Sequence, residues 1–365
     1  MKVLHVITGL AAGGAEQQLH LLLRYQSTGA EVATLTNLGS VAEAIRRDGT
    51  VVHDLGMRRN TDVAALPRLA RLIRTRRFDL VHTHLYRACV YGRLAARLAG
   101  VRPVVATEHS LGETSIEGRR LSNGVKALYL ATERLGQTTI AVSTAVARRL
   151  RACGVPASRI ETIPNGVDLH RYRFDPAQRA RLRARLGIGL ERFVVGTVGR
   201  LVPEKRTDEV MRAVSGLADV TVLVVGAGTD RAALGTLARQ LRVDTVFVGE
   251  VTDVSGLLSA MDMLAAPSVQ ETFGLSVIEA LTAGLPVAYG SCPALDDLAA
   301  DPVPGAIRVS ADRPALRNAV LDTIRAGPRR LAPPPALERY DIARVAGQVH
   351  ELYERVIHTT TEEEP

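Results

Sequence analysis

Apolar and polar residues alternate along the chain on two periods. Short apolar runs of the kind that form buried strands are separated by longer segments, in which apolar residues recur about every three or four positions as on one face of a helix. In the first half the runs that predict strands are KVLHVI, EVATLT, FDLVHTH, PVVATEHS and TTIAVS. Strands that alternate with helices in this way predict an α/β fold with parallel sheets.

A second series of strands follows the turn-rich segment ETIPNGVDLHRYRF. Its expected strands are FVVGTVGRL, VTVLVVGAG, TVFVGEV, MDMLAAPS and PVAYGS. The two series predict two doubly wound domains, 1–168 and 169–341, with a linker near 166–190 and Gly166 as a candidate hinge. A last helix at about 342–358 could pack back on the first domain, and the polar tail HTTTEEEP is expected to be disordered.

Composition agrees with two globular cores in a reducing compartment. The chain has 365 residues, of which 46% are hydrophobic and 23% charged, so it is long and apolar enough for two cores. Cys89, Cys153 and Cys292 lie far apart without metal-ligand spacing, which suits unpaired thiols in a cytosol. No apolar run is long enough for a membrane span, and we expect a cytoplasmic protein.

The net charge of +8 raises the question of nucleic acid or membrane binding. Basic residues are scattered through helical segments and aromatic residues make up only 4% of the chain, which disfavours nucleic acid as a partner. The arginine-rich segment LPRLARLIRTRRFDL predicts a core-facing helix with a solvated basic face. Peripheral contact with anionic lipid on the inner membrane face is the alternative.

The stretch SVQETFGLSVIEALTAGLPV carries the most specific chemistry. Its apolar spacing predicts a helix that begins near Gly274 and stops at Gly284, with Glu271 before the helix and Glu279 inside it. The N-terminus of a helix is a ready site for a phosphate or diphosphate. Glu279 could then reach ribose hydroxyls and Glu271 a sugar. The alternative is that both carboxylates are ordinary surface groups.

Other strand ends supply weaker signals when each is taken alone. Gly13 and Gly14 form a loop before a helix, without the lysine of a Walker motif or the spacing of a dinucleotide fingerprint. The VVGAG segment has Gly226 and Gly228 but lacks a third glycine, so a turn is the simpler interpretation.

Cations and a histidine also lie at predicted strand ends, where open α/β sheets bind ligands. His109 follows the PVVATE strand, and Arg200 and Lys205 flank a turn in VGRLVPEKR. Lys205 is one of only three lysines, with Lys2 and Lys126. Two such cations could neutralise a diphosphate leaving group without a metal, and the chain contains no Asp-x-Asp motif.

These pieces, in this order, resemble glycosyltransferase family 4, whose members are retaining enzymes of GT-B fold. The matching segments are GGAE, ATEH, AVSTAVARRL, IPNGVD, VGRLVPEKR, VVGAG, FVGEV, APSVQETFGLSVIEAL and GLPV, from residue 1 to about residue 290. The resemblance implies two Rossmann-like domains that face each other across a cleft. The first would bind the acceptor and the second the nucleotide-sugar donor.

The resemblance implies donor-binding residues, which are Gly14, Arg200, Lys205, Val251, Phe273, Gly274, Leu275 and Glu279. Arg200 and Lys205 would bind the diphosphate with the backbone N–H groups of residues 273–275. Glu279 would bind the ribose, and the backbone around Glu250 and Val251 would meet the base.

The implied catalytic residues are His109, Glu271, Arg200 and Lys205. Glu271 would bind hydroxyls of the donor sugar, and His109 would lie over its reacting carbon. Gly13, Gly14 and His109 would border the acceptor. No metal and no cofactor are expected, because the nucleoside diphosphate sugar is a co-substrate.

The implied reaction transfers a hexose or N-acetylhexosamine, expected to be UDP-linked, with retention. The departing phosphate oxygen would help to remove the proton of the acceptor. The acceptor is left open between a lipid-linked glycan and a small hydrophilic metabolite such as an aminocyclitol. Two other functions are weighed: an NAD-dependent oxidoreductase built on VVGAG, and a non-catalytic nucleotide-sugar-binding partner protein.

One segment departs from the family pattern. Where the family usually has a glycine-rich loop and a Pro-Glu pair, this chain has AYGSCPALDDLAADP, with Cys292, Pro293 and Asp296 or Asp297 in their place. The departure puts in doubt the transfer of donor and acceptor detail. A surface loop with aspartate caps is the simpler interpretation.

Overall fold

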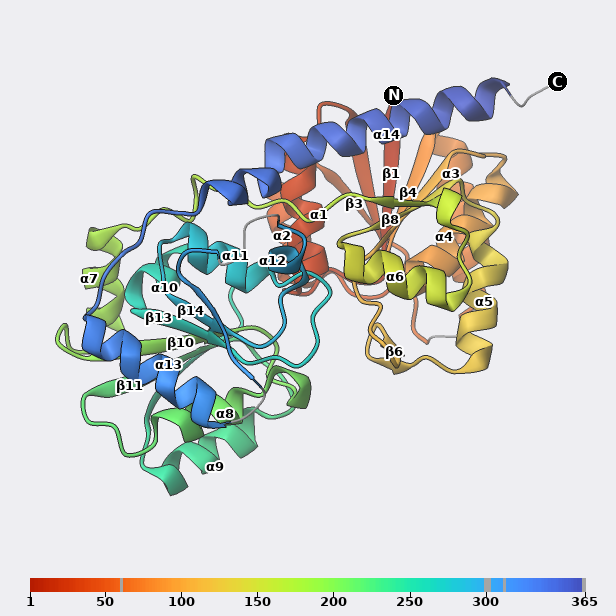
Figure 1. Ribbon diagram of the computed structural model, residues 1–365. Helices are drawn as coiled ribbons and strands as arrows, with labels where there is room; N and C mark the ends of the chain where they lie inside the picture. Colours follow the sequence, from red (N-terminus) through yellow and green to blue (C-terminus); the bar gives the residue numbers. More distant parts are fainter. Residues whose placement is uncertain (60–61, 299–302, 311–312, 363–365) are drawn as a thin grey trace. The chain divides into compact units, whose positions relative to one another are not determined.

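The structure is a computed structural model that describes residues 1–59, 62–298, 303–310 and 313–362. It divides the chain into two compact units, shown in Figure 1. Unit 1 comprises Met1–Gly166 and Ile342–Pro365, and unit 2 comprises Val167–Asp341. The sequence predicted domain boundaries after residues 168 and 341.

Unit 1 is built on a seven-stranded sheet in which every strand pairing is parallel. In sheet order its strands are β3 (Val51–Asp54), β2 (Gly29–Thr34), β1 (Lys2–Ile7), β4 (Leu80–His84), β5 (Val104–Glu108), β8 (Thr138–Ala141) and β9 (Ile160–Thr162). The short strands β3 and β9 were not predicted, because runs of four and three residues carry little pattern.

Helices flank this sheet, and a small antiparallel hairpin follows β5. The helices are α1 (Gly14–Tyr25), α2 (Gly39–Arg47), α3 (Ala65–Arg76), α4 (Tyr86–Ala99), α5 (Asn123–Glu133), α6 (Thr144–Cys153), η1 (Ala157–Arg159) and α14 (Ile342–Glu362). The hairpin consists of β6 (Ser115–Ile116) and β7 (Arg119–Arg120).

Helix α14 returns the chain to unit 1, where it runs beside α1 in Figure 1. Its buried residues Val345, Val349, Leu352 and Val356 pack in one core cluster with residues of β1, β4, β5 and β8. This burial of apolar surface explains why the last helix belongs to the first unit rather than to the second.

The expected disorder of the tail is wrong for residues 358–362, which continue α14. The hydroxyls of Thr359 and Thr360 donate to the carbonyls of Arg355 and Val356, four positions earlier, so these polar residues add bonds to the last turns. Residues 363–365 lie outside the described residues.

Unit 2 contains a six-stranded sheet, again with parallel pairings throughout. In sheet order its strands are β12 (Asp244–Gly249), β11 (Val220–Val225), β10 (Phe193–Val198), β13 (Met263–Ala266), β14 (Val287–Tyr289) and β15 (Ala306–Arg308). Its helices are α7 (Pro176–Arg185), η2 (Pro203–Lys205), α8 (Thr207–Val214), α9 (Arg231–Leu241), α10 (Ser255–Ala260), α11 (Leu275–Thr282), α12 (Pro293–Asp296), α13 (Arg313–Ala326) and η3 (Pro335–Tyr340). The three-residue strand β15 was not predicted.

Each sheet has one point where the strand order reverses. In unit 1 it lies between β1 and β4, and in unit 2 between β10 and β13. At such a point the connections on either side leave in opposite directions, so the carboxyl ends of the two strands border a crevice where open α/β sheets bind ligands.

Close packing of loops accounts for the glycines of VVGAG. A Cβ atom at Gly226 would lie 1.9 Å from the carbonyl oxygen of Gly199, and one at Gly228 would lie 2.2 Å from that of Leu201. The N–H of Gly226 donates to the carbonyl of Gly249 at 2.8 Å. These glycines therefore let the loops after β10, β11 and β12 approach one another.

Gly166, the candidate hinge, ends the first segment of unit 1 in a tightly packed position. Its N–H donates to Oε1 of Gln18 at 2.9 Å, and its carbonyl accepts from Nε2 of Gln18 at 2.8 Å. A Cβ atom here would lie 2.4 Å from Cδ1 and 3.0 Å from Cα of Ile342. Space, rather than an unusual backbone conformation, requires glycine at this position.

Gly166→Ala is expected to lower the free energy of unfolding by about 1–3 kcal/mol, because the added methyl group overpacks against Ile342. Urea unfolding followed by circular dichroism measures the change. Gly347→Ala on α14 is the control, since no atom lies within 4 Å of its added Cβ. The control should raise the free energy by roughly 0.5–1 kcal/mol. Equal effects of the two substitutions would contradict the packing argument.

Candidate functional site

In unit 2 an ion pair joins two of the predicted residues at the point where the strand order reverses. Lys205 ends η2, which follows β10, and Glu271 follows β13. Nζ of Lys205 contacts Oε1 of Glu271, and the two side chains are 25% and 17% exposed. Parallel strands thus bring together two residues that lie 66 positions apart. Both charges remain accessible to a ligand.

Arg200 supplies a second cation at the same strand end. It follows β10 after Gly199 and is exposed. Among the residues that the structure describes, its guanidinium has no hydrogen-bond or ion-pair partner within bonding distance. Arg200 can therefore turn toward an anion without breaking an internal contact.

Helix α11 begins where the sequence predicted, with Gly274 as its N-cap residue. Gly274 has a φ of 99°, and a Cβ atom there would lie 2.5 Å from Sγ of Cys292. Both the backbone conformation and the lack of space demand glycine. The first N–H groups of a helix have no intrahelical partner, so the backbone of Phe273, Gly274 and Leu275 can donate to an anion.

Glu279 lies inside α11 and faces a tyrosine that the sequence analysis missed. The hydroxyl of Tyr172 donates to Oε1 of Glu279 at 3.0 Å. Burial raises the pKa of Glu279 to about 7, against the opposing effects of Tyr172 and the Arg171 cation. Tyr172 lies in the segment between the two strand series, and its signal was an aromatic residue in a chain with few of them.

The predicted base-binding residues follow the edge strand of this sheet. Glu250 and Val251 come directly after β12, which is separated from β10 by β11. Their loop continues to Asp253, which forms a 3.1 Å ion pair with Arg171. Since Arg171 precedes Tyr172, this loop approaches the surroundings of Glu279.

Residues 288–298 of the segment that departs from the family pattern are mostly buried, so the interpretation as a capped surface loop is wrong for them. Residues 299–302 lie outside the described residues. Cys292, Ala294 and Leu295 are buried, and residues Pro293–Asp296 form α12. The N–H of Ala294 donates to the carbonyl of Phe273 at 2.9 Å, and the thiol of Cys292 donates to the same carbonyl at 3.4 Å.

This segment therefore packs against the loop before α11 and holds it through the carbonyl of Phe273. Asp296 pairs with Arg308 instead of capping a helix, and the N-cap residue of α12 is Cys292, without a side-chain bond. Burial raises the pKa of the Cys292 thiol to about 12, which keeps it protonated and unreactive.

In unit 1 His109 lies directly after β5, as predicted, and is neutral at neutral pH. Burial lowers its pKa to about 4, against an opposing effect of Asn165. Its Nε2 atom lies 3.3 Å from Nδ1 of His84. Beside these rings is a cavity of about 40 Å³ that Thr107 and Asn165 also line, large enough for a water molecule.

Gly13 and Gly14 lie at the start of α1, after β1. Gly13 is the N-cap residue, with a φ of −110°, and Gly14 is the first residue of the helix. Because α1 follows a strand at the order reversal of unit 1, its N-terminal N–H groups offer an anion site of the same kind as α11.

Three buried histidines have the composition of a metal site, but their geometry does not fit one. The ring nitrogens of His5, His82 and His84 come within 4.8 Å of one another. Each of these nitrogens already has a hydrogen-bond partner at 2.6–3.3 Å. The rings of His82 and His84 also pack against each other, with centroids 4.1 Å apart and a tilt of 38° between the ring planes. We assign no metal ion to this cluster.

Several arginines of the basic helix α3 bond to other groups of unit 1 at its surface. Arg68 pairs with Asp62 at 3.2 Å, Arg76 pairs with Glu31 at 2.7 Å, and Arg74 donates to the carbonyl of Leu98 at 2.9 Å. In the described part of the chain, none of the helices combines the length and apolar character needed to cross a bilayer.

Glu279→Gln is expected to make the free energy of unfolding fall less steeply as the pH rises. The pKa of Glu279 is about 7 in the folded protein, above its ordinary value of 4.5, so between these two values the folded state binds an extra proton. Raising the pH from about 5 to about 8 therefore lowers the free energy of unfolding of the wild type. The variant lacks this carboxyl and does not show this part of the decrease.

Urea unfolding of both proteins at the two pH values measures this difference. Burial also raises the pKa of Glu108 to about 7. Its effect on the free energy of unfolding is the same in both proteins, so it cancels in the difference between them. Glu204→Gln, at an exposed carboxylate on η2, serves as the matched control and should follow the wild type. Parallel pH curves for the wild type and Glu279→Gln would contradict the assignment.

Comparison with known families gives two matches that together extend over most of the chain. A family model described as Glycosyltransferase Family 4 matches residues 12–171. A second, described as Glycosyl transferases group 1, matches residues 192–326.

Two curated proteins illustrate the range of relatives. A 2-deoxystreptamine glucosyltransferase of Streptomyces kanamyceticus is 30% identical over 323 residues, which are 80% of this chain and 82% of that protein. A UDP-Gal:alpha-D-GlcNAc-diphosphoundecaprenol alpha-1,3-galactosyltransferase of Escherichia coli is 30% identical over 238 residues, which are 62% of this chain and 61% of that protein.

Among solved structures, that of Anabaena HepE in complex with UDP and glucose is similar to this fold. The TM-score is 0.85 at 24% identity, with 97% of this chain and 100% of that chain covered. At this identity the likeness shows the architecture alone, which is GT-B.

Proposed function

The chain belongs to glycosyltransferase family 4, and we propose that it is a retaining enzyme that transfers a hexose or N-acetylhexosamine from a UDP-sugar to a hydroxyl of a small hydrophilic acceptor. The observation that carries this proposal is the Lys205–Glu271 pair at the order reversal of unit 2, next to the N-terminus of α11. It joins a cation for the phosphates to a carboxylate for the sugar.

The donor diphosphate would exchange partners with groups that are already in place. Lys205 would leave Glu271 for the phosphates and be joined by Arg200 and by the N–H groups of residues 273–275. These donors stabilise the negative charge that develops on the departing phosphate. Because two side-chain cations serve this role, we propose that the reaction needs no metal at the donor site.

Glu271, once released by Lys205, would accept hydrogen bonds from hydroxyls of the sugar. The bond from C1 of the sugar to the phosphate oxygen breaks while the bond to the acceptor oxygen forms on the same face. The proton of the acceptor hydroxyl passes to the departing phosphate oxygen. Because the acceptor oxygen enters on the face that the phosphate leaves, the carbon keeps its configuration through an oxocarbenium-like transition state, and no carboxylate is assigned as a covalent nucleophile.

The nucleoside would bind through Glu279 and the loop after β12. The hydrogen bond that Tyr172 gives to Glu279 shows that this carboxylate accepts from a hydroxyl, as a ribose would require. The backbone of Glu250 and Val251 would meet the base. Support for uracil comes from HepE, whose solved complexes contain UDP, UDP with glucose, and UDP-glucose.

Residues of unit 1 would serve the sugar and the acceptor. His109, neutral because burial lowers its pKa to about 4, would contact the donor sugar near its reacting carbon. Gly13 and Gly14 would donate backbone N–H groups to the donor phosphates and border the acceptor.

The acceptor proposed is an aminocyclitol or a metabolite of similar size and polarity. The relative named for 2-deoxystreptamine aligns with 80% of this chain, whereas the relative named for a diphosphoundecaprenol-linked acceptor aligns with 62%. A lipid-linked glycan is the second candidate, and it would bring the protein to the inner membrane face.

We expect UDP to raise the thermal unfolding midpoint, because a ligand that binds only the folded state stabilises it by about 2.7 kcal/mol at 100 times its Kd. GDP, TDP, ADP and NAD are the comparison ligands. Lys205→Ala should weaken UDP binding by at least about tenfold, and Lys126→Ala, at an exposed lysine on α5, is the matched control. A shift with NAD alone would overturn the proposal.

Turnover is measured with UDP-glucose and 2-deoxystreptamine by mass spectrometry. Lys205→Ala and Glu271→Gln should each reduce kcat/KM by about a hundredfold or more, since each removes a group that acts on charge in the transition state. Retained turnover in both variants would contradict the assignment of these residues to the site. Binding of UDP without turnover of any acceptor would favour a non-catalytic partner protein.

A further inference from the structure

A row of hydrogen bonds runs from His109 through the core of unit 1 to helix α1. Nε2 of His109 lies 3.3 Å from Nδ1 of His84, and Nε2 of His84 lies 3.1 Å from Nδ1 of His5. Nε2 of His5 lies 3.1 Å from Oε1 of Gln26, directly after α1. His109 directly follows β5, and His84 and His5 lie in β4 and β1; these three strands are neighbours in the sheet.

The amide of Gln26 sets the direction of this row. Its nitrogen donates to the hydroxyl oxygen of Thr28, and its oxygen faces His5, where it can only accept. His5 must then carry its proton on Nε2 and accept on Nδ1. The same step repeated at His84 and His109 leaves a proton on Nε2 of each ring and a lone pair on Nδ1 of His109.

This argument requires neutral rings, and the surroundings provide them. Burial lowers the pKa of His5 and of His109 to about 4, and it lowers the pKa of His84 well below its usual value. A neutral imidazole has one donor and one acceptor, so a row of neutral rings can point only one way at a time.

Backbone strain next to His84 is a second observation at this row. Leu85, which is buried and directly follows His84, has a φ of 72° and a ψ of 156°. Residues other than glycine rarely adopt this backbone conformation, and it persists only where the surrounding structure holds it. The chain thus keeps a strained turn at the point that places the middle ring.

We infer that His84, His5 and Gln26 are positioning residues that hold His109 in the Nε2–H tautomer. Its Nδ1, which is buried and has no hydrogen-bond partner among the described residues, then keeps its lone pair for a hydroxyl that enters the adjoining cavity. This inference rests on the role proposed for His109 above. The row orients a ring and does not carry protons, because the amide of Gln26 does not pass a proton on. His82 lies outside the row, since its ring bonds to Tyr353 and Thr107.

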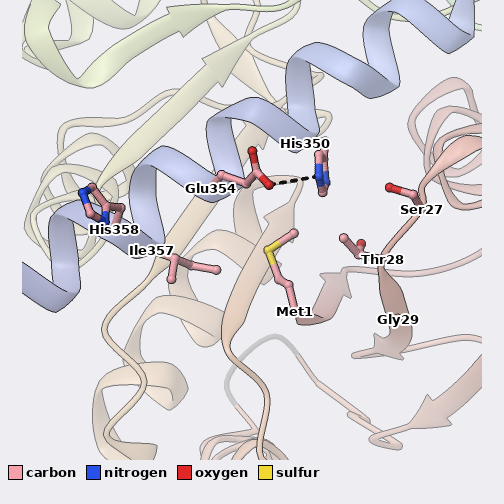
Figure 2. A pocket seen from close by; sticks show the side chains of 8 residues that line it. All are labelled: Met1, Ser27, Thr28, Gly29, His350, Glu354, Ile357 and His358. Carbon is pink, nitrogen blue, oxygen red and sulfur yellow. Dashed lines mark ion pairs between the residues drawn. The ribbon is translucent and has the colours of Figure 1, made fainter.

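The anchor of the row lies near the surface, where it can be altered without opening the core. Thr28, which accepts from the amide nitrogen of Gln26, lines a pocket of about 840 Å³, shown in Figure 2. Ser27 and Gly29 lie beside it there, and His350 and Glu354 of α14 face it from the other side. Gln26 itself is half-buried.

Three substitutions at Gln26 give three different expectations for His109. Gln26→Glu keeps an acceptor and should keep the Nε2–H tautomer at about pH 8, where neighbouring imidazoles stay neutral. Gln26→Lys offers only donors and should reverse the row, so that Nδ1 of His109 carries the proton. Gln26→Met offers neither and should give a mixture of the two tautomers.

Long-range proton–nitrogen NMR spectra of protein labelled with ¹⁵N-histidine read the tautomer of each ring directly. The signals of His109 are assigned from a His109→Asn variant, and the histidines outside the row report on folding. Tyr353→Phe is the matched control, because it removes a bond of His82 and leaves the row intact. An unchanged His109 tautomer in Gln26→Lys would overturn the inference.

Turnover of UDP-glucose with 2-deoxystreptamine tests the consequence. Gln26→Lys should lower kcat by about tenfold, Gln26→Met by less, and Gln26→Glu should restore it. UDP binding should be the same in all three, because the contacts proposed for UDP are made by residues of unit 2 and by the backbone of Gly13 and Gly14, none of which belongs to the row. A reversed His109 tautomer with unchanged kcat would overturn the positioning role. Failure of the wild type and of all variants to bind UDP would overturn the proposed function but would not affect the tautomers read by NMR.

Discussion

The structure depends on one constraint, which is that parallel strands bring their carboxyl ends to the same edge of a sheet. Neighbouring strands β10 and β13 pair at Val195 with Met263 and at Gly196 with Leu264. That register sets Lys205 and Glu271 within bonding distance although they are far apart in the sequence. Apolar burial along both strands maintains this arrangement, so the chemistry at the strand ends is a consequence of the core.

At that edge the protein holds its charged groups in bonds that cost little to exchange. The Lys205–Glu271 pair is partly exposed, and such pairs contribute only about 0–1 kcal/mol. Replacing Glu271 by a phosphate at Lys205 therefore forfeits little stability. The bond from Tyr172 to Glu279 can likewise be replaced by one from another hydroxyl with no change in the number of hydrogen bonds. The groups that a ligand would replace, a carboxylate at Lys205 and a hydroxyl at Glu279, resemble the phosphate and hydroxyl groups of the ligand itself.

Much of this was predictable from the sequence because the signals are local. Each expected apolar run corresponds to a strand, and the helix beginning after Gly274 follows from spacing and from its glycine. The burial of Cys292 was not predictable, since it arises from packing against the loop at Phe273, 19 positions away. Strand β15 has three residues, too few for any period to show.

The histidine row shows where such prediction stops. The alternation of side chains along a strand places His82 and His84 on one face of β4, which the sequence could have shown. The pairing register of β1 with β4, which sets His5 opposite His82, could not be read from either segment alone. The direction of the row depends in addition on Gln26 and Thr28, which lie outside every predicted strand.

The two units thus carry polar networks of different kinds. In unit 2 Arg200, Lys205 and Glu271, which are proposed to bind the diphosphate and the sugar, are charged groups at least partly exposed to solvent, which suits a charged diphosphate whose own desolvation must be offset. The row behind His109 in unit 1 is made of neutral rings without net charge, and burial keeps it so. A neutral, directional hydrogen bond is the interaction that discriminates one uncharged hydroxyl from another, because a buried donor or acceptor left unpaired is costly. The proposed contacts therefore match charged groups to the diphosphate and a neutral row to a hydroxyl.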